Sequence, residues 1–255
     1  MDPVAFLQAG MLLPRGPKAR DVAINIGRLH GALERAGYTV SITHELERVV
    51  ELFQRRGLPL SPVADPTYHP QASAPDRTLI VLLERDGVSV GTTVQRRIYT
   101  GDLAADMRDL SFWYGQTKWP PPGTTCMVAG DWAEPIRETA VVYSCAFALA
   151  GQQGRKDSSA AALIRLGHAM ALATWDWGWL FGRGTAALAQ HFGFNIHGSH
   201  TVANGVWLLQ PGQDPATHPH LVVLEKRQAF FETAALHAYG DPAATLRIPE
   251  ELHPA

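Results

Sequence analysis

Residues 151–158 form a polar, glycine-flanked loop between an apolar run and an apolar helical segment. The loop carries Arg155 and Lys156, and Asp157 or Ser158 is placed to cap the helix that follows. The first amides of a helix have no partners within the helix and stand at the positive end of its dipole. A diphosphate would meet several donors there, and Gly154 would let the backbone approach closely. The loop predicts an anion site, and a plain helix cap with two solvated basic residues is the alternative.

Side chains that could move protons lie on or beside the apolar run 138–150. Alternation along a strand places Tyr143 and Cys145 on one face and Ser144 on the other. Tyr143 could protonate a leaving thiolate, with core packing as the alternative. Glu138 stands at the start of the run as a further acid–base candidate. Cys145 is interpreted as a small buried hydrophobe rather than a nucleophile.

Asp176 lies within a tryptophan-rich stretch. On a regular strand, Trp175, Trp177 and Trp179 would share one face and Asp176 would face the other way. The indoles could wall an acceptor pocket or pack beneath a helix. Asp176 would then be a buried acid that acts as a base or anchors an amine, or simply a turn residue.

Three histidines follow close together in the sequence. His191 lies near the end of a predicted helix, where the dipole favours a positive charge, so it is either structural or a fallback proton donor. His197 and His200 form an H-x-x-H pair with no cysteine or carboxylate at metal-ligand spacing. We therefore expect no metal site.

Hydrophobic periodicity predicts an alternation of helices and strands. The first helix places Val22, Ile26, Leu29 and Leu33 on one face, and Asp86-Gly87 predicts a hairpin turn. Hairpins come first and strand–helix units later, which indicates a mixed sheet covered by helices. The predicted helices are 21–37, 43–57 (capped by Thr43), 102–115, 158–173, 183–194 and the end of 220–240; the predicted strands are two within 77–99, then 138–150, 174–182, 199–209 and the start of 220–240; 59–75 and 119–135 are loops.

This element order resembles the GNAT superfamily of N-acyltransferases over residues 20–225. Residues 86–91 are similar to the D-G-x-x-V-G hairpin of that family, and residues 152–157 to its pyrophosphate loop. Residues 191–194 are similar to the G-F that closes its fourth helix. Residues 1–19 are then an irregular lead-in, and residues 226–255 are a C-terminal helix and tail packed on the domain.

The resemblance implies an α/β (α+β) fold with a mixed, mostly antiparallel central sheet, helices on both faces and a splayed central strand pair. It implies acetyl-CoA or a longer acyl-CoA as co-substrate and an amine of a small molecule or peptide as acceptor. The acyl arm would enter the splay, where a backbone amide polarises the thioester carbonyl. The implied CoA-binding residues are Ala148, Leu149, Ala150, Gln153, Gly154, Arg155, Lys156, Asp157 and Ser158.

Two positions depart from the family pattern. Lys156 replaces a small residue of the pyrophosphate loop, and Ala189 replaces a tyrosine before the G-F. These departures favour a non-catalytic acyl-CoA-binding or regulatory module on the same fold. Acylation from a carrier protein and thioester hydrolysis are two further reactions that this scaffold could support.

Composition narrows the function classes. The formal net charge is −2, which argues against a general nucleic-acid binder. Two cysteines do not make a secreted disulfide framework, and no run of about 18 apolar residues predicts a membrane span. The residues around Met1 make a poor signal peptide, so we expect a cytoplasmic protein with no membrane partner. A homodimer stays open.

Overall fold

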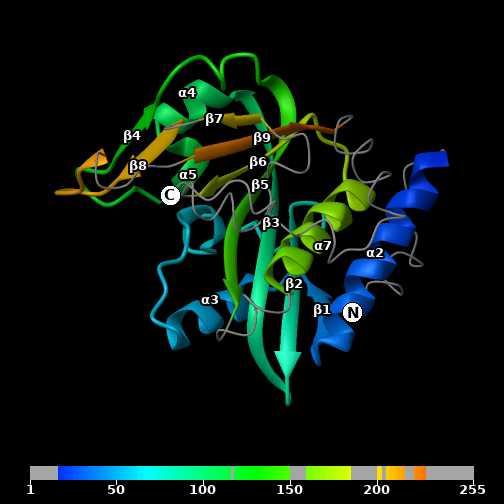
Figure 1. Cartoon of the computed structure of the whole chain (residues 1–255). Helices are drawn as coiled ribbons and strands as arrows, with labels where there is room; N and C mark the ends of the chain where they lie inside the picture. Colours follow the sequence, from blue (N-terminus) through cyan, green and yellow to red (C-terminus); the bar gives the residue numbers. More distant parts are fainter. Residues whose placement is uncertain are drawn as a thin grey trace, which may run out of the picture.

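The computed structural model describes residues 17–115, 118–149, 159–184, 200–202, 205–215 and 221–227. A seven-stranded, mostly antiparallel sheet in the order β1-β2-β3-β5-β6-β9-β7 forms its centre (Figure 1). Helices α2 and α7 lie together on one face, and the other face packs on α3, α4 and α5. The coarse prediction of a mixed sheet with helices on both faces is confirmed.

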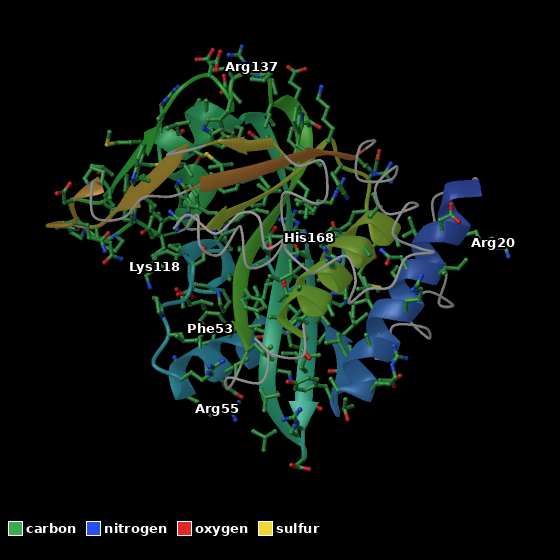
Figure 2. All side chains as sticks on the ribbon, viewed as in Figure 1. Arg20, Phe53, Arg55, Lys118, Arg137 and His168 are labelled. Carbon is green, nitrogen blue, oxygen red and sulfur yellow. The ribbon has the colours of Figure 1, made fainter. Side chains whose placement is uncertain are left out.

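Two helices cover the first face of the sheet. Helix α2 (Pro17–Arg35) buries the predicted apolar stripe Val22, Ile26, Leu29 and Leu33, and Gly37 follows with φ 84°. Helix α7 (Ser159–Thr174) is buried on all sides, as an alanine-rich, largely apolar sequence allows. The helix begins at Pro17, so residues 17–19 are helical rather than irregular. Figure 2 shows Arg20 on α2 pointing outward and His168 on α7 lying within the molecule.

The predicted hairpin joins β2 (Thr78–Arg85) to β3 (Val88–Asp102). Asp86 has φ 54° and Gly87 has φ 74°, the two positive values that a type I′ turn requires. Arg85 pairs with Val88 directly across that turn.

A short strand, β1 (Thr39–Thr43), precedes α3 (Leu46–Arg55) at the edge of the sheet. Thr43 pairs with Ile80 in the sheet, so its predicted role as helix cap is wrong and Glu45 occupies that position. The Thr43 hydroxyl instead accepts a hydrogen bond from the Glu45 amide at 3.2 Å. Helix α3 still ends before Gly57, which has φ 61°.

The predicted helix 102–115 is divided into α4 (Leu103–Arg108) and α5 (Ser111–Tyr114). Leu110 has φ 72°, a left-handed conformation that interrupts the helix. Asp102 caps α4 by accepting from the Ala105 amide at 3.0 Å. The 3₁₀ turn η1 (Pro62–Ala64) in the proline-rich loop packs near α5.

Two predicted boundaries in the second half of the chain are wrong. The segment 199–209 is divided between β7 (His200–Val202), which pairs with β9 (Leu221–Lys226), and β8 (Val206–Leu209). Strand β8 forms a separate two-stranded sheet with β4 (Thr125–Val128), which lies inside the expected loop 119–135. Residues 228–255, including the expected C-terminal helix, lie outside the described residues.

The tryptophan-rich stretch is not a regular strand. Helix α7 runs to Thr174, and β6 (Trp179–Gly184) starts later than the predicted 174–182. Trp175 and Trp177 pack in the α2–α7 core, whereas Trp179 packs against the opposite core, so the three indoles do not share a face. Residues 183–184 belong to β6 rather than to the predicted helix 183–194, whose remainder lies outside the described residues.

Gly167 sets the distance between α7 and β3. A Cβ atom there would lie 2.6 Å from the Thr93 methyl and 3.0 Å from Gln95 Nε2. We expect Gly167→Ala to lower the free energy of unfolding by about 1–2 kcal/mol, because overpacking outweighs the helix propensity of alanine. In Gly27→Ala on α2, no atom lies within 4 Å of the new Cβ, and we expect a gain of about 0.5–1 kcal/mol. Urea denaturation of both variants checks these opposite signs, and a stabilising Gly167→Ala would refute the close packing.

Candidate functional site

Strand β5 (Arg137–Leu149) and β6 are a parallel pair joined by α7. Their pairing runs from Val141 and Trp179 to Ser144 and Gly182. Both strands continue beyond it: β5 pairs with β3 up to Leu149, and β6 pairs with β9 up to Gly184. No strand in the described sheet pairs with residues 145–149 on the β6 side, and we call these residues the released segment of β5.

A β-bulge marks the start of the released segment. Gln95 pairs with Ser144 and Val94 with Ala146, so Cys145 is an extra residue in β5. Tyr143 before the bulge and Cys145 within it both face the α3 side, so they share a face as predicted, and Gln95 Nε2 donates to Ser144 Oγ at 3.2 Å. After it, the phase changes. Ala146 and Ala148 now line the α3 side, and Phe147 and Leu149 pack toward α7.

The predicted acyl-CoA residues fall in and beyond the released segment. Ala148 is buried and pairs with Thr92, and Leu149 pairs with Gly91. The separation from β6 begins at Cys145, three residues earlier than the residues singled out by the sequence. The described part of helix α7 spans Ser159–Thr174. The other predicted contacts lie outside the described residues: Ala150, Gln153, Gly154, Arg155, Lys156, Asp157 and Ser158.

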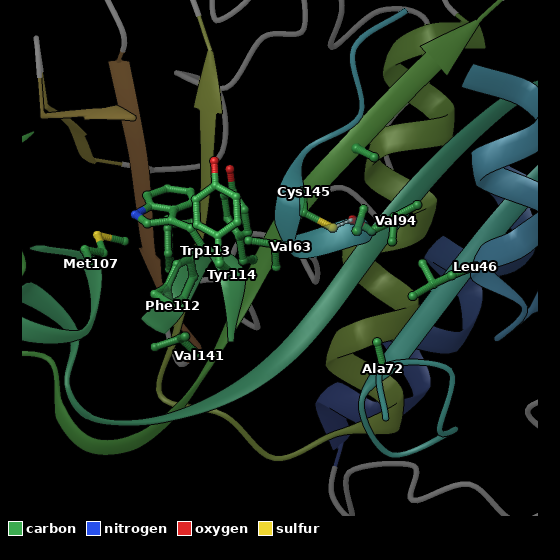
Figure 3. Close-up of a cluster of buried hydrophobic side chains, with 14 of the residues drawn as sticks. Leu46, Val63, Ala72, Val94, Met107, Phe112, Trp113, Tyr114, Val141 and Cys145 are labelled. Atoms are coloured by element: carbon green, nitrogen blue, oxygen red, sulfur yellow. Dashed lines mark hydrogen bonds between the residues drawn. The ribbon is translucent and has the colours of Figure 1, made fainter. Parts of the chain in front are cut away.

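Tyr143 is held in an aromatic cluster on the α3 side of the sheet. Its ring stacks on Phe181 at 4.9 Å and meets Phe112 at 5.5 Å and Trp113 at 5.8 Å, both edge-on. Figure 3 shows Phe112, Trp113 and Tyr114 of α5 gathered in this cluster. Burial raises the pKa of the Tyr143 phenol, and the charge of nearby Arg183 opposes that rise. Tyr143 is therefore both a core residue and a phenol that keeps its proton at neutral pH.

Arg183 is not among the site residues predicted from the sequence, because the predicted helix 183–194 includes it. It is the fifth residue of β6, and its guanidinium carbon lies 5.1 Å from the centre of the Trp113 ring. The guanidinium also lies near Tyr143 and Tyr114, and burial raises the pKa of the Tyr114 phenol as well. The available signal was an arginine between two glycines directly after the buried run W-L-F.

Both thiols are free and held in their neutral form. Burial raises the pKa of Cys145 to about 12, and its thiol donates to the Val94 carbonyl at 3.6 Å (Figure 3). Burial also raises the pKa of Cys126 to about 11, and its sulfur accepts from Trp113 Nε1 at 3.2 Å. These surroundings agree with Cys145 as a packing residue rather than a nucleophile.

The two predicted carboxylates lie away from the released segment. Glu138 is exposed with φ 45°, and Ala148 lies ten positions further along β5, about 33 Å of extended strand. Asp176 is not a buried acid, because its side chain is 90% exposed and lies 3.5 Å from Arg227 Nη1. It belongs to the turn after α7, where its carbonyl accepts from Arg97 Nε at 2.9 Å.

The three histidines that lie close together in the sequence do not form a site within the described residues. His191 and His197 lie outside the described residues, and His200 is in β7. Within the described ranges, no group of three or more His, Cys, Asp and Glu side chains could hold a metal ion. No helix in those ranges is long and apolar enough to cross a membrane.

Two further titratable residues lie buried on α7, one turn apart. Burial lowers the pKa of Arg165 to about 10. Burial, and then the charge of Arg165, lower the pKa of His168 to about 4. His168 is therefore a neutral imidazole at physiological pH, and sequence periodicity alone gave no sign of it.

Compared with known proteins, the sequence matches no protein-family model and no curated protein.

Proposed function

We propose that this protein is an acyltransferase that moves an acyl group from acyl-CoA to an amine of a small molecule or peptide. The proposal keeps the resemblance to GNAT enzymes, with a splayed strand pair at the centre of the sheet. The observation that supports it is the pairing of β5 with β6, which stops at Ser144 and Gly182 although both strands continue. Helix α7, whose described part spans Ser159–Thr174, follows the loop predicted from the sequence.

In this proposal the acyl thioester lies along the released segment of β5. Backbone amides there, freed from pairing with β6, would polarise the thioester carbonyl. The neutral amine attacks the carbonyl carbon, the C–S bond breaks, and the product is an amide plus CoA. The amine loses a proton and the departing thiolate gains one. Tyr143 keeps its proton at neutral pH, which is the state a donor to that thiolate needs.

Calorimetric titration with acetyl-CoA and octanoyl-CoA tests the donor site. We expect Arg155→Ala to weaken binding about 10- to 100-fold, because a charge-assisted contact to the diphosphate is lost. The control is Arg20→Ala, which removes an equal charge from the exposed surface of α2 and should leave binding unchanged. Absence of binding by the parent protein, or equal binding by Arg155→Ala, would contradict the proposal.

A non-catalytic acyl-CoA-binding module is the second candidate. It is favoured by the distance of Glu138 from the released segment and by the exposure of Asp176. Acyl-CoA binding without transfer to any amine of a broad panel would support this module over the enzyme. If transfer occurs, Tyr143→Phe should slow it while leaving acyl-CoA affinity unchanged.

The two free thiols support a reducing compartment, and we propose the cytoplasm.

A further inference from the structure

Two shielded polar atoms lie beside the hydroxyl of Tyr143. The Ser61 hydroxyl and the Arg183 guanidinium are both close enough to act on the Tyr143 phenol. Yet Ser61 Oγ and Arg183 Nη1 make no hydrogen bond of good geometry with the described part of the chain. Buried polar groups in native proteins nearly always have a hydrogen-bond partner, so two such atoms beside one phenol call for an explanation.

Arg183 pairs with no carboxylate among the described residues. Arg48, Arg137 and Arg227 each pair with a carboxylate. Arg96, the buried arginine on the same side of the sheet, donates to the Val63 carbonyl. The guanidinium of Arg183 instead lies over the Trp113 ring, which stabilises a cation, and its Nη1 atom has no hydrogen-bond partner in the described part of the chain, so that atom is available to an anion.

The place of Arg183 in the sheet suits a ligand. It follows Gly182, the last residue of β6 that pairs with β5, so it stands where the two strands separate. Arg183 and Ser61 are each partly exposed, whereas Tyr143 between them is buried. Arg183, Tyr143 and Ser61 come from β6, β5 and the residue before η1, and both Tyr143 and the Trp113 ring beneath Arg183 belong to the core opposite α7.

We propose that Arg183 and Ser61, which both lie beside Tyr143, bind the carboxylate of a small organic ligand. A guanidinium and a hydroxyl together supply the donors that one carboxylate requires. If the proposed acyltransferase function holds, this ligand is the acceptor, an amine that also carries a carboxyl group, as amino acids do. The carboxylate site itself does not depend on acyl transfer.

Calorimetry without acyl-CoA tests the site with two matched pairs of probes: L-phenylalanine against its amide, and L-alanine against its amide. We expect at least one acid to bind at least 10-fold more tightly than its amide. Arg183→Gln should remove that preference, Arg183→Lys should recover part of it, and Ser61→Ala should weaken the acid 3- to 10-fold. Arg20→Gln is the control for loss of charge, and Ser61→Ala keeps the test open if the Arg183 variants do not fold.

Several results would overturn this proposal. These are equal binding of acid and amide, binding of neither, or an acid preference that survives in Arg183→Gln. Inorganic phosphate that binds as tightly as the preferred acid would also count against a carboxylate. A protein that binds the acid but no acyl-CoA would keep this site and refute the proposed function. Acyl-CoA binding without a preference for the acid over its amide would refute the carboxylate site and keep the proposed function.

Discussion

Replacing Phe181 with alanine is expected to lower the free energy of unfolding by about 3–5 kcal/mol. Phe181 is fully buried on β6, stacks on Tyr143 at 4.9 Å, and contacts Phe112 at 5.7 Å and Trp132 at 6.1 Å. Truncation leaves a cavity that these aromatic neighbours cannot fill without leaving their own contacts. Urea denaturation followed by circular dichroism measures the loss.

Tyr99→Ala is the control for Phe181→Ala. Tyr99 lies on β3 and is 70% exposed, so its removal should change stability by less than about 0.5 kcal/mol. Phe181→Leu keeps most of the buried volume and should lose less than Phe181→Ala. A loss below about 1 kcal/mol for Phe181→Ala would mean that this aromatic cluster is not the packed core described here.

Stability is expected to fall by about 3 kcal/mol between pH 6.5 and pH 4 through His168 alone. Burial, together with the charge of Arg165, lowers the pKa of His168 from 6.5 to about 4. Above pH 6.5 the imidazole is neutral in both the folded and the unfolded chain, and it contributes no pH dependence. Between pH 6.5 and 4 only the unfolded chain takes up the proton, so acid favours unfolding.

Chemical denaturation at a series of pH values, compared between the parent and His168→Gln, isolates this contribution. Between pH 6.5 and 4 the free energy of unfolding of the variant should depend less steeply on pH than that of the parent, by up to about 1.4 kcal/mol per pH unit. This difference in slope does not depend on the stability of the variant at pH 8. Met170→Leu alters the buried surface of the same helix without a titratable group, and it should keep the slope of the parent. Identical slopes for the parent and His168→Gln would show that His168 titrates normally in the folded protein.

Local sequence signals predicted the elements that carry strong periodicity or a defined turn. Each of these signals lies within one short stretch of the sequence: the apolar stripe on α2, the Asp86-Gly87 turn and the long apolar strand β5. Strand β1 was missed because it has only five residues and is stabilised by pairing with β2 rather than by its own pattern. The break at Leu110 was missed for a related reason, since leucine gives no local sign of a left-handed conformation.

Only the part of the candidate site that lies within the single strand β5 could be predicted from the sequence. Alternation correctly predicted that Tyr143 and Cys145 share one face of the sheet. The bulge at Cys145 cannot be read from β5 alone, because it exists only in the register with β3. Arg183 reaches Tyr143 and Trp113 through the pairing of β6 with β5 and the packing of α5, both contacts between distant parts of the sequence.

The order β6-β9-β7 places a later strand between two earlier ones. During synthesis, β6 and β7 leave the ribosome before β9, and neither can complete its pairing until Leu221–Lys226 has emerged. Until then the nascent chain presents an open sheet edge at β6, the kind of surface that recruits chaperones or joins another nascent chain. Translation that stalls shortly before Leu221 should therefore leave an aggregation-prone product, although most of the sheet has already been made.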